Sequence, residues 1–269
     1  MKKINSTSFC VTAAIALAAI AVSSPAHAQD VLFGAVQTIT GDSNLLSSGG
    51  PSPTAGITNI DAALFFGPSQ TVDGVTFNST SNLAVFKTGT TFTDGVFTLT
   101  ATSGGFETYG ANATLPIGPG ASAAFNTVMT SGGVFATVAN TTTGTLTISA
   151  AALTLGATYE VQIFNRSAAQ ANESTIFTSA NSAQVFDDQG GNNSANHIGE
   201  FVTGTFVATG LNEVITLSSG GGPDVPVLND VNLVEINPAT VPEPSTYALL
   251  LGGLALLTLQ LRRQRHLSS

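Results

Sequence analysis

Short runs in which apolar residues alternate with Thr or Ser limit the fold more than any other feature of this chain. In an extended strand, residues 97–101 and 145–149 place apolar side chains on one face and hydroxyls on the other. Residues 159–164, 201–207 and 213–217 show the same alternation, and Gly-containing turn signals separate the runs. Neither a fixed-length repeat nor an amphipathic helix pattern accompanies them. We therefore predict an all-β chain, built as an antiparallel β-sandwich or jelly roll.

The second half of the chain carries a resemblance that agrees with this fold. Its blocks are residues 159–166, residues 199–208 and residues 227–233, in that order. This order resembles the galactose-binding-like jelly-roll domains of surface proteins from polysaccharide-associated bacteria. The resemblance implies a fold and not a ligand. We expect a β-sandwich ectodomain over residues 29–240, with residues 141–236 as its second half. The first half would supply the remaining strands or a separate small sandwich.

The C-terminus has three consecutive parts with different physical properties. They are the motif Val241-Pro242-Glu243-Pro244, the apolar run 245–261, and a basic tail over 262–265 with Arg262, Arg263 and Arg265. The prolines cannot continue a helix, because each lacks an N–H and restricts the residue before it. The apolar run would form a helix of about 25 Å, just enough to cross a bilayer core of about 30 Å. The arginines should stay in the cytoplasm, so we predict a membrane helix with the preceding chain outside.

This arrangement resembles the PEP-CTERM sorting signal of Gram-negative bacteria, in which a Pro-Glu-Pro motif, a membrane helix and a basic tail follow one another. Over residues 241–265, the resemblance implies that a membrane-embedded exosortase recognises the motif and removes or exchanges the tail. It also implies delivery to the cell surface or the medium, and an association with exopolysaccharide production. The residues alone leave two alternatives open: an ordinary core helix, or a membrane anchor that is not processed.

The N-terminus predicts export. Lys2 and Lys3 precede an apolar core at 11–22, and Ala26 and Ala28 are the small residues that a signal peptidase requires. We therefore expect residues 1–28 to be a signal peptide that is cleaved after Ala28. Cys10 is the only cysteine and lies inside this signal. The mature chain would have no thiol, which excludes a disulfide, a cysteine nucleophile and a thiolate metal site.

The predicted ectodomain is strongly acidic. Lys87 and Arg166 are its only basic residues, against fifteen Asp and Glu residues between positions 30 and 235. With so few cations the chain cannot neutralise a row of phosphates, so we exclude a nucleic-acid partner. The negative charge favours solubility and leaves carboxylates available to divalent cations.

The sequence contains no evident catalytic constellation, and we expect no enzyme activity. His197 is the only histidine of the predicted ectodomain, and no serine near it has the glycine-flanked context of a nucleophile elbow. The chain has no tryptophan, which leaves Tyr109, Tyr159 and exposed phenylalanines to stack against sugars. A pair of carboxylates that meet only in the fold remains an open alternative.

One loop offers ligands for a cation. Residues 187–197 include Asp187, Asp188 and Asn192, together with further asparagines and two glycines. Carboxylate and amide oxygens are the ligands that Ca²⁺ selects, so these three residues are a candidate site for a structural Ca²⁺, and we expect no other cofactor. The spacing does not fit an EF-hand loop, and a polar loop between strands is the alternative reading. A second, weaker candidate combines residues 220–224 with Asp230.

Three functions agree with these features. The first, which we favour, is a non-catalytic surface or matrix protein that exosortase sorts and that associates with exopolysaccharide. The second is a carbohydrate-binding module with a Ca²⁺-dependent glycan site in the loops around residues 166–198, where Arg166→Ala would abolish binding. The third is a secreted hydrolase. In each case the chain would cross the inner membrane, remain anchored transiently, and reach the cell surface or the medium.

Overall fold

Three β-sheets account for most of the regular structure. The computed structural model describes residues 30–50, 53–79, 85–110, 120–130, 132–136, 142–166, 173–179, 182–188, 199–219, 227–228 and 230–236. The predicted signal peptide and the predicted membrane helix at 245–261 lie outside these residues. Among the helices that are described, none has the length and apolar character needed to cross a membrane.

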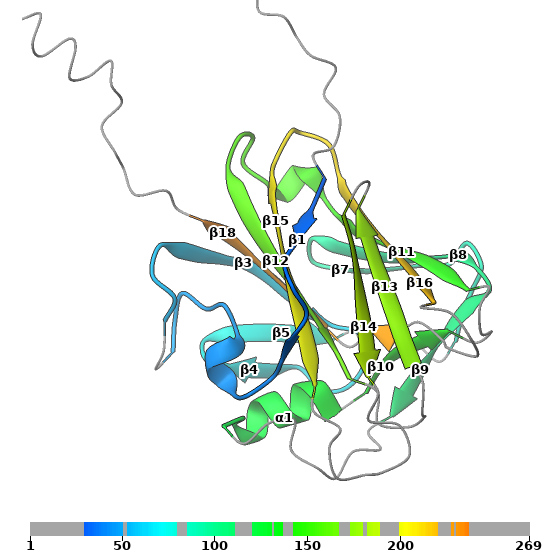
Figure 1. The fold of residues 1–269 in the computed structure, drawn as a ribbon, viewed down its shortest axis with the longest axis horizontal. Helices are drawn as coiled ribbons and strands as arrows, with labels where there is room; N and C mark the ends of the chain where they lie inside the picture. Colours follow the sequence, from blue (N-terminus) through cyan, green and yellow to red (C-terminus); the bar gives the residue numbers. More distant parts are fainter. Residues whose placement is uncertain are drawn as a thin grey trace, which may run out of the picture.

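The largest sheet contains strands from both ends of the chain. Its members are β1 (Leu32–Phe33), β2 (Gln37–Thr38), β3 (Ile57–Leu64), β4 (Gln70–Val72), β5 (Val75–Ser79), β12 (Thr158–Asn165), β15 (Glu200–Val207) and β18 (Asp230–Ile236). The order is β1-β15-β12-β18-β3-β5-β4, with β2 paired to β15. The pairs are antiparallel except for β3 with β5. Because β18 lies between β12 and β3, the two halves of the chain share this sheet (Figure 1).

Two smaller sheets complete the fold. The six-stranded sheet has β7 (Thr91–Asp94), β8 (Phe97–Ser103), β11 (Thr143–Ile148), β13 (Glu173–Ser179), β14 (Ser182–Asp188) and β16 (Glu213–Ser219). Its order is β14-β13-β16-β11-β8-β7. The four-stranded sheet has β6 (Val85–Lys87), β9 (Gly105–Gly110), β10 (Gly132–Ala136) and β17 (Val227–Leu228), in the order β17-β10-β9-β6.

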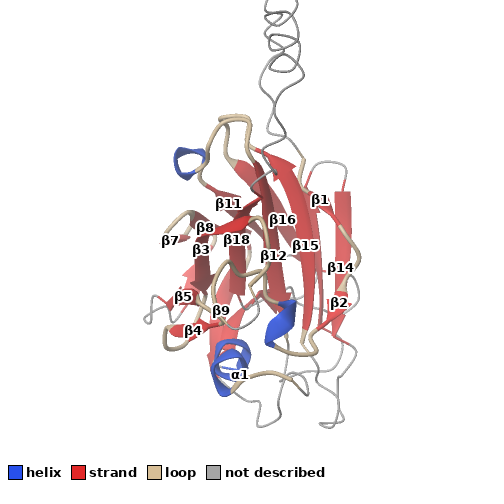
Figure 2. Cartoon of the chain, turned by 90° about the vertical axis from the view of Figure 1, so that its left-hand side faces the viewer, coloured by secondary structure: helices blue, strands red, loops and turns tan. Residues whose placement is uncertain are grey.

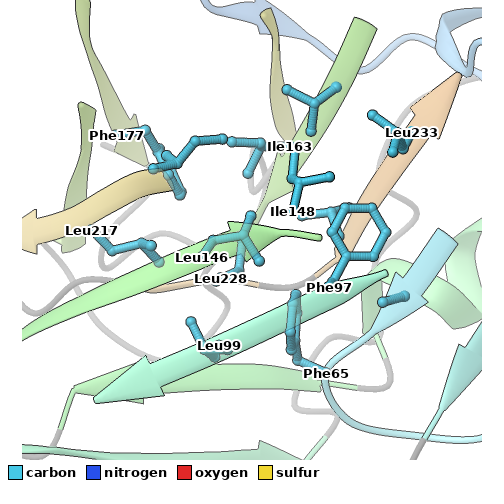
Figure 3. Packing of buried hydrophobic residues seen from close by; sticks show 14 of the residues in the cluster. Phe65, Phe97, Leu99, Leu146, Ile148, Ile163, Phe177, Leu217, Leu228 and Leu233 are labelled. Atoms are coloured by element: carbon cyan, nitrogen blue, oxygen red, sulfur yellow. The ribbon is translucent and has the colours of Figure 1, made fainter. Parts of the chain in front are cut away.

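The main hydrophobic core fills the space between the largest sheet and the six-stranded sheet. Ile163 and Leu233 come from the first, and Leu99, Leu146 and Leu217 from the second (Figure 3). The four-stranded sheet adds residues to the same core, including Phe106 and Leu228. Phe106 packs closely on Gly144 of β11, since a Cβ added to Gly144 would lie 2.7 Å from the Phe106 ring. The predicted antiparallel β-sandwich is therefore confirmed.

A second core covers the opposite face of the largest sheet. The helix α1 (Ala123–Thr130) places Phe125, Val128 and Met129 against this face, and the Phe125 ring meets the Phe164 ring edge to face at 5.8 Å. The sequence pattern had not indicated this helix, because a helix of only about two turns gives a weak periodic signal. A cap was nevertheless present, since Ser122 Oγ accepts a hydrogen bond from the Phe125 N–H at 3.1 Å.

Two buried amides fasten the N-terminal segment to the same face. The Leu46 N–H donates to Gln162 Oε1 at 2.7 Å, and Gln162 Nε2 donates to the Asn44 carbonyl at 2.8 Å. Asn232 Nδ2 donates to the Leu46 carbonyl at 2.8 Å. Asn44 ends the short 3₁₀ helix η1 (Asp42–Asn44), so these bonds satisfy backbone groups that would otherwise be buried without partners.

Replacing Gln162 with Leu should lower the free energy of unfolding by about 3 kcal/mol, because it leaves the Leu46 N–H and the Asn44 carbonyl without their hydrogen bonds. Urea denaturation of the exported protein would measure this loss. The matched control is Gln37→Leu, at an exposed position of β2, which should change the stability little. Equal losses in the two variants would contradict a fastening role for Gln162.

Candidate functional site

The predicted Ca²⁺ site lies at an end of the β13–β14 hairpin. Asp187 and Asp188 are the last residues of β14, and in register they stand opposite Ser174 and Glu173 of β13. Asn192 and the rest of the loop lie outside the described residues, as do residues 220–224 of the second candidate. Within the described part of the chain, no group of three or more His, Cys, Asp or Glu residues is arranged to hold a metal ion.

The side chains proposed for sugar contacts are buried where the structure describes them. Arg166, at the end of β12, is 1% exposed, so its guanidinium belongs to the framework and not to an open loop. Tyr159 is fully buried, and its ring stacks on Phe206 at 5.5 Å. The Tyr159 hydroxyl accepts the Thr154 N–H at 2.7 Å and donates to Glu235 Oε2 at 3.1 Å. Neither residue can therefore serve as a surface platform for a glycan.

The outer face of the six-stranded sheet carries an ordered array of threonines. One row crosses five neighbouring strands from β7 to β13, and every position in it is a threonine. The strand register aligns Thr91, Thr100, Thr145, Thr216 and Thr178 in this row. A parallel row on the same face contains Thr93, Thr98 and Thr147 and ends at Val214. We call these two rows, together with Thr102, Thr143 and Ser218, the threonine face.

The threonine face exists because the strands β7, β8, β11 and β16 alternate between core and solvent. In β11, Leu146 and Ile148 are fully buried, whereas the alternating residues Thr145 and Thr147 are partly exposed. Neighbouring strands lie about 4.8 Å apart, and alternate residues of one strand about 6.7 Å apart. The rows therefore form a regular two-dimensional grid of hydroxyl and methyl groups on the outer face of this sheet.

Hydroxyl pairs hold part of this grid in place. Thr93 and Thr98 share a hydrogen bond of 3.1 Å, and Thr102 and Thr143 share one of 2.7 Å. Each hydroxyl still has further donor or acceptor capacity, because it offers one donor and two acceptor lone pairs. In β7, β8, β11 and β16, no outward-facing position of the grid is charged. The array can therefore offer many weak, neutral hydrogen bonds over a wide area.

Two carboxylates lie close together beside the turn between β7 and β8. Asp61 of β3 accepts the Val96 N–H at 2.7 Å and so links the largest sheet to this turn. One carboxylate oxygen of Asp94 is buried and makes no hydrogen bond to the described residues. Burial, followed by the charge of Asp61, raises the pKa of Asp94 above its ordinary value. At neutral pH the charged form of Asp94 thus opposes folding.

We expect Asp94→Asn to raise the melting temperature at pH 7, because it removes a carboxylate whose charged form is destabilised by burial and by the charge of Asp61. Because its pKa is raised, the Asp94 carboxyl of the wild type binds a proton more tightly in the folded state than in the unfolded state. The stability of the wild type should therefore rise as the pH falls through the raised pKa of Asp94 toward the ordinary value of 3.8. Asp94→Asn should lose that part of the rise. Melting curves at pH 7 and pH 4.5, with Asp30→Asn as the control, would test both statements. A lower melting temperature for Asp94→Asn at pH 7 would contradict them.

The threonine face was only partly foreseeable from the sequence. Thr98, Thr100, Thr145 and Thr147 stand out as alternating residues in single runs. Their alignment depends on pairing between strands far apart in the chain, and no local pattern reveals that register.

The comparisons with known proteins concern the C-terminus. Residues 240–264 match the PEP-CTERM protein-sorting motif, which confirms the resemblance seen in Pro242-Glu243-Pro244, the apolar run and the basic tail. The search among curated proteins gives no match. The matched residues begin four positions after β18 ends at Ile236, so the sorting signal directly follows the last strand of the sandwich. The chain is thus an exported protein that carries a PEP-CTERM sorting motif, with a C-terminal membrane anchor before cleavage and exosortase as its processing enzyme.

Proposed function

We propose that the chain is a non-catalytic protein of the cell surface or extracellular matrix, and that its threonine face associates with exopolysaccharide. The observation that carries this proposal is the row of five aligned threonines on a sheet face that has no charged residue in β7, β8, β11 or β16. The sorting motif supports it, because that motif directs an exported protein toward the same compartment as a secreted polysaccharide.

The chemistry of the face suits a polysaccharide. Sugar hydroxyls are both donors and acceptors, and threonine hydroxyls can pair with them in either sense. The threonine methyl groups offer apolar contacts to the C–H groups of a sugar ring. Each such contact is weak in water, so affinity has to come from many contacts made at once. A repeating polymer lying along a repeating grid meets this condition, since every further contact is formed intramolecularly.

The charge of the chain favours a neutral glycan. The described face presents no cation to pair with sulfates or uronates, and the ectodomain as a whole is strongly acidic. An anionic polysaccharide would therefore need a bridging divalent cation.

A Ca²⁺-dependent glycan site is the second candidate. Its support is the register that sets Asp188 directly opposite Glu173, because like charges opposite one another in a sheet repel unless a cation relieves them. We propose Asp187, Asp188 and Asn192 as the ligands, as the sequence indicates. The two candidates differ in their response to EDTA, which should abolish binding only if Ca²⁺ holds the glycan.

The double variant Thr100→Val, Thr145→Val should bind the polysaccharide of the source strain about tenfold more weakly than the wild type. Valine keeps the shape and β-propensity of threonine but removes two hydroxyls from the centre of the grid. Co-sedimentation of the exported protein with the purified polysaccharide, in Ca²⁺ and in EDTA, would measure the change.

The matched control for this experiment is Thr71→Val, Thr76→Val. These two threonines are also paired and exposed, with hydroxyls 2.9 Å apart, but they lie on β4 and β5 of the other sheet. They should bind like the wild type. Equal binding by all three proteins would refute a role for the threonine face, and loss of binding in EDTA would favour the Ca²⁺ site.

For the sorting signal, Glu243→Ala or Pro244→Ala should leave the full-length chain in the membrane with its tail attached, because exosortase would no longer recognise the motif. Mass spectrometry of the mature C-terminus would show this. Pro238→Ala is the matched control, since Pro238 precedes the matched residues, and it should be processed normally. A wild-type protein that still ends at Ser269 after export would show instead that the tail is an unprocessed anchor.

A further inference from the structure

The exposed large apolar side chains of the described residues all lie toward one end of the sandwich. Leu155 (72% exposed) and Leu211 (41%) lie in its end loops, Leu32 (62%) lies on the outer face of the largest sheet, and Val214 (42%) lies on the threonine face. In the register of the largest sheet, Thr158 at the start of β12 stands opposite Val207 and Ile236 at the ends of β15 and β18. Leu155 and Leu211 occupy the loops that extend beyond this level. We call this the leucine end, and it lies opposite the end that carries α1 (Figure 2).

The two loops of the leucine end form one continuous platform. The Ala150 N–H donates to Asn212 Oδ1 at 2.9 Å, which joins the loop over 149–157 to the loop over 208–212. The Gly156 N–H donates to the Ala208 carbonyl at 2.8 Å, and the Ala208 N–H returns a bond to Ala157 at 2.9 Å. Leu155 also lies beside Gly210, where a Cβ would be 3.6 Å from Leu155 Cδ1. The apolar groups are thus held in place by hydrogen bonds and are not on separate loose loops.

The leucine end is also where the sandwich connects to the C-terminal membrane anchor. β18 ends there at Ile236, and residues 240–264 carry the sorting motif. Eight residues separate Ile236 from Ser245, where the apolar run begins, so this connection can span at most about 30 Å even when fully extended. β1 begins near the same end, because Leu32 pairs with Thr205, two residues before β15 ends. The attached anchor therefore keeps this end near the bilayer.

The charge distribution of the leucine end permits an apolar contact. The loops over 149–157 and 208–212 contain no charged residue. Four acidic residues close to them, Asp30, Asp94, Glu160 and Glu235, are half-buried, and Glu213, which follows Asn212, is buried. There is no cluster of lysines or arginines that would bind anionic headgroups, so any contact with lipid would be driven by the leucines and would respond little to salt.

We propose that the leucine end rests on the lipid surface of the bilayer that holds the C-terminal anchor, and that it leaves this surface when the tail is removed. The inference uses the anchor that the sorting motif implies and does not depend on glycan binding. The short connection confines the end to the membrane surface, so even a weak apolar contact is occupied while the anchor is attached. Two leucines in the end loops, with one apolar side chain on each flanking sheet face, are too few to hold an untethered protein, so cleavage would release it.

A single fluorescent reporter can test this contact in the full-length chain. Because Cys10 is the only cysteine, Cys10→Ser gives a thiol-free background, and Thr154→Cys places a label on an exposed position beside Leu155. The labelled protein would be reconstituted through its anchor into vesicles of phosphatidylethanolamine and phosphatidylglycerol that contain brominated acyl chains. We expect the brominated lipids to quench the label at position 154 at least threefold more than a label at Ser43→Cys, on η1 near α1.

A second variant distinguishes a leucine end that is merely held near the bilayer by the anchor from one whose leucines contact the lipid. Leu155→Ser with Leu211→Ser should reduce quenching at position 154 toward that of Ser43→Cys, while the anchor stays in place. Quenching that is the same at positions 154 and 43 would overturn the proposal, as would quenching at position 154 that the serine variant leaves unchanged. Shielding of the label that depends on protein concentration and persists in detergent would also overturn it, in favour of contact between copies of the chain.

Discussion

Both faces of β12 are buried, and the rest of the architecture depends on this double burial. Tyr159, Val161 and Ile163 point into the core shared with the six-stranded sheet. On the opposite face, Gln162 and Phe164 are covered by residues 44–46 and by α1. A central strand of this kind has to satisfy its polar groups without water, which explains why amides there bind backbone groups of the N-terminal segment. Because the largest sheet is covered at its centre, the six-stranded sheet is the layer that presents a regular face to solvent.

The parts of the fold that follow from local pattern were predictable from the sequence. β8, β11 and β16 alternate between core and solvent. Their alternating sequence pattern was evident because one face of each strand is exposed to solvent. The helix α1 and the segment over 40–50 were not evident, since their role is to cover a sheet face that the alternation rule treats as solvent-exposed. The order of the strands was also beyond local reasoning, because β3 pairs with β18 across most of the chain.

The candidate sites show the same limit. Single residues that looked suited to ligand contact, such as Arg166 and Tyr159, are buried by neighbours far away in sequence. Conversely, threonines that are unremarkable one at a time become an array once β11 is paired on one side with β8 and on the other with β16. A function that depends on one short continuous segment can be predicted from the sequence, as the sorting motif was. Chemistry that depends on register across a sheet cannot.

The positions of the leucine end and the threonine face are related through the direction of the strands. Two central strands of the six-stranded sheet run away from the leucine end, because β11 ends at Ile148 just before the loop over 149–157 and β16 begins at Glu213 just after the loop over 208–212. With the leucine end on the bilayer, these strands would rise from the membrane, and the threonine face would stand upright beside it. A polysaccharide emerging at the surface could then meet the face while the chain is still anchored. The same connection that holds the domain for processing would thus also orient its binding face, and cleavage would free the domain without altering that face.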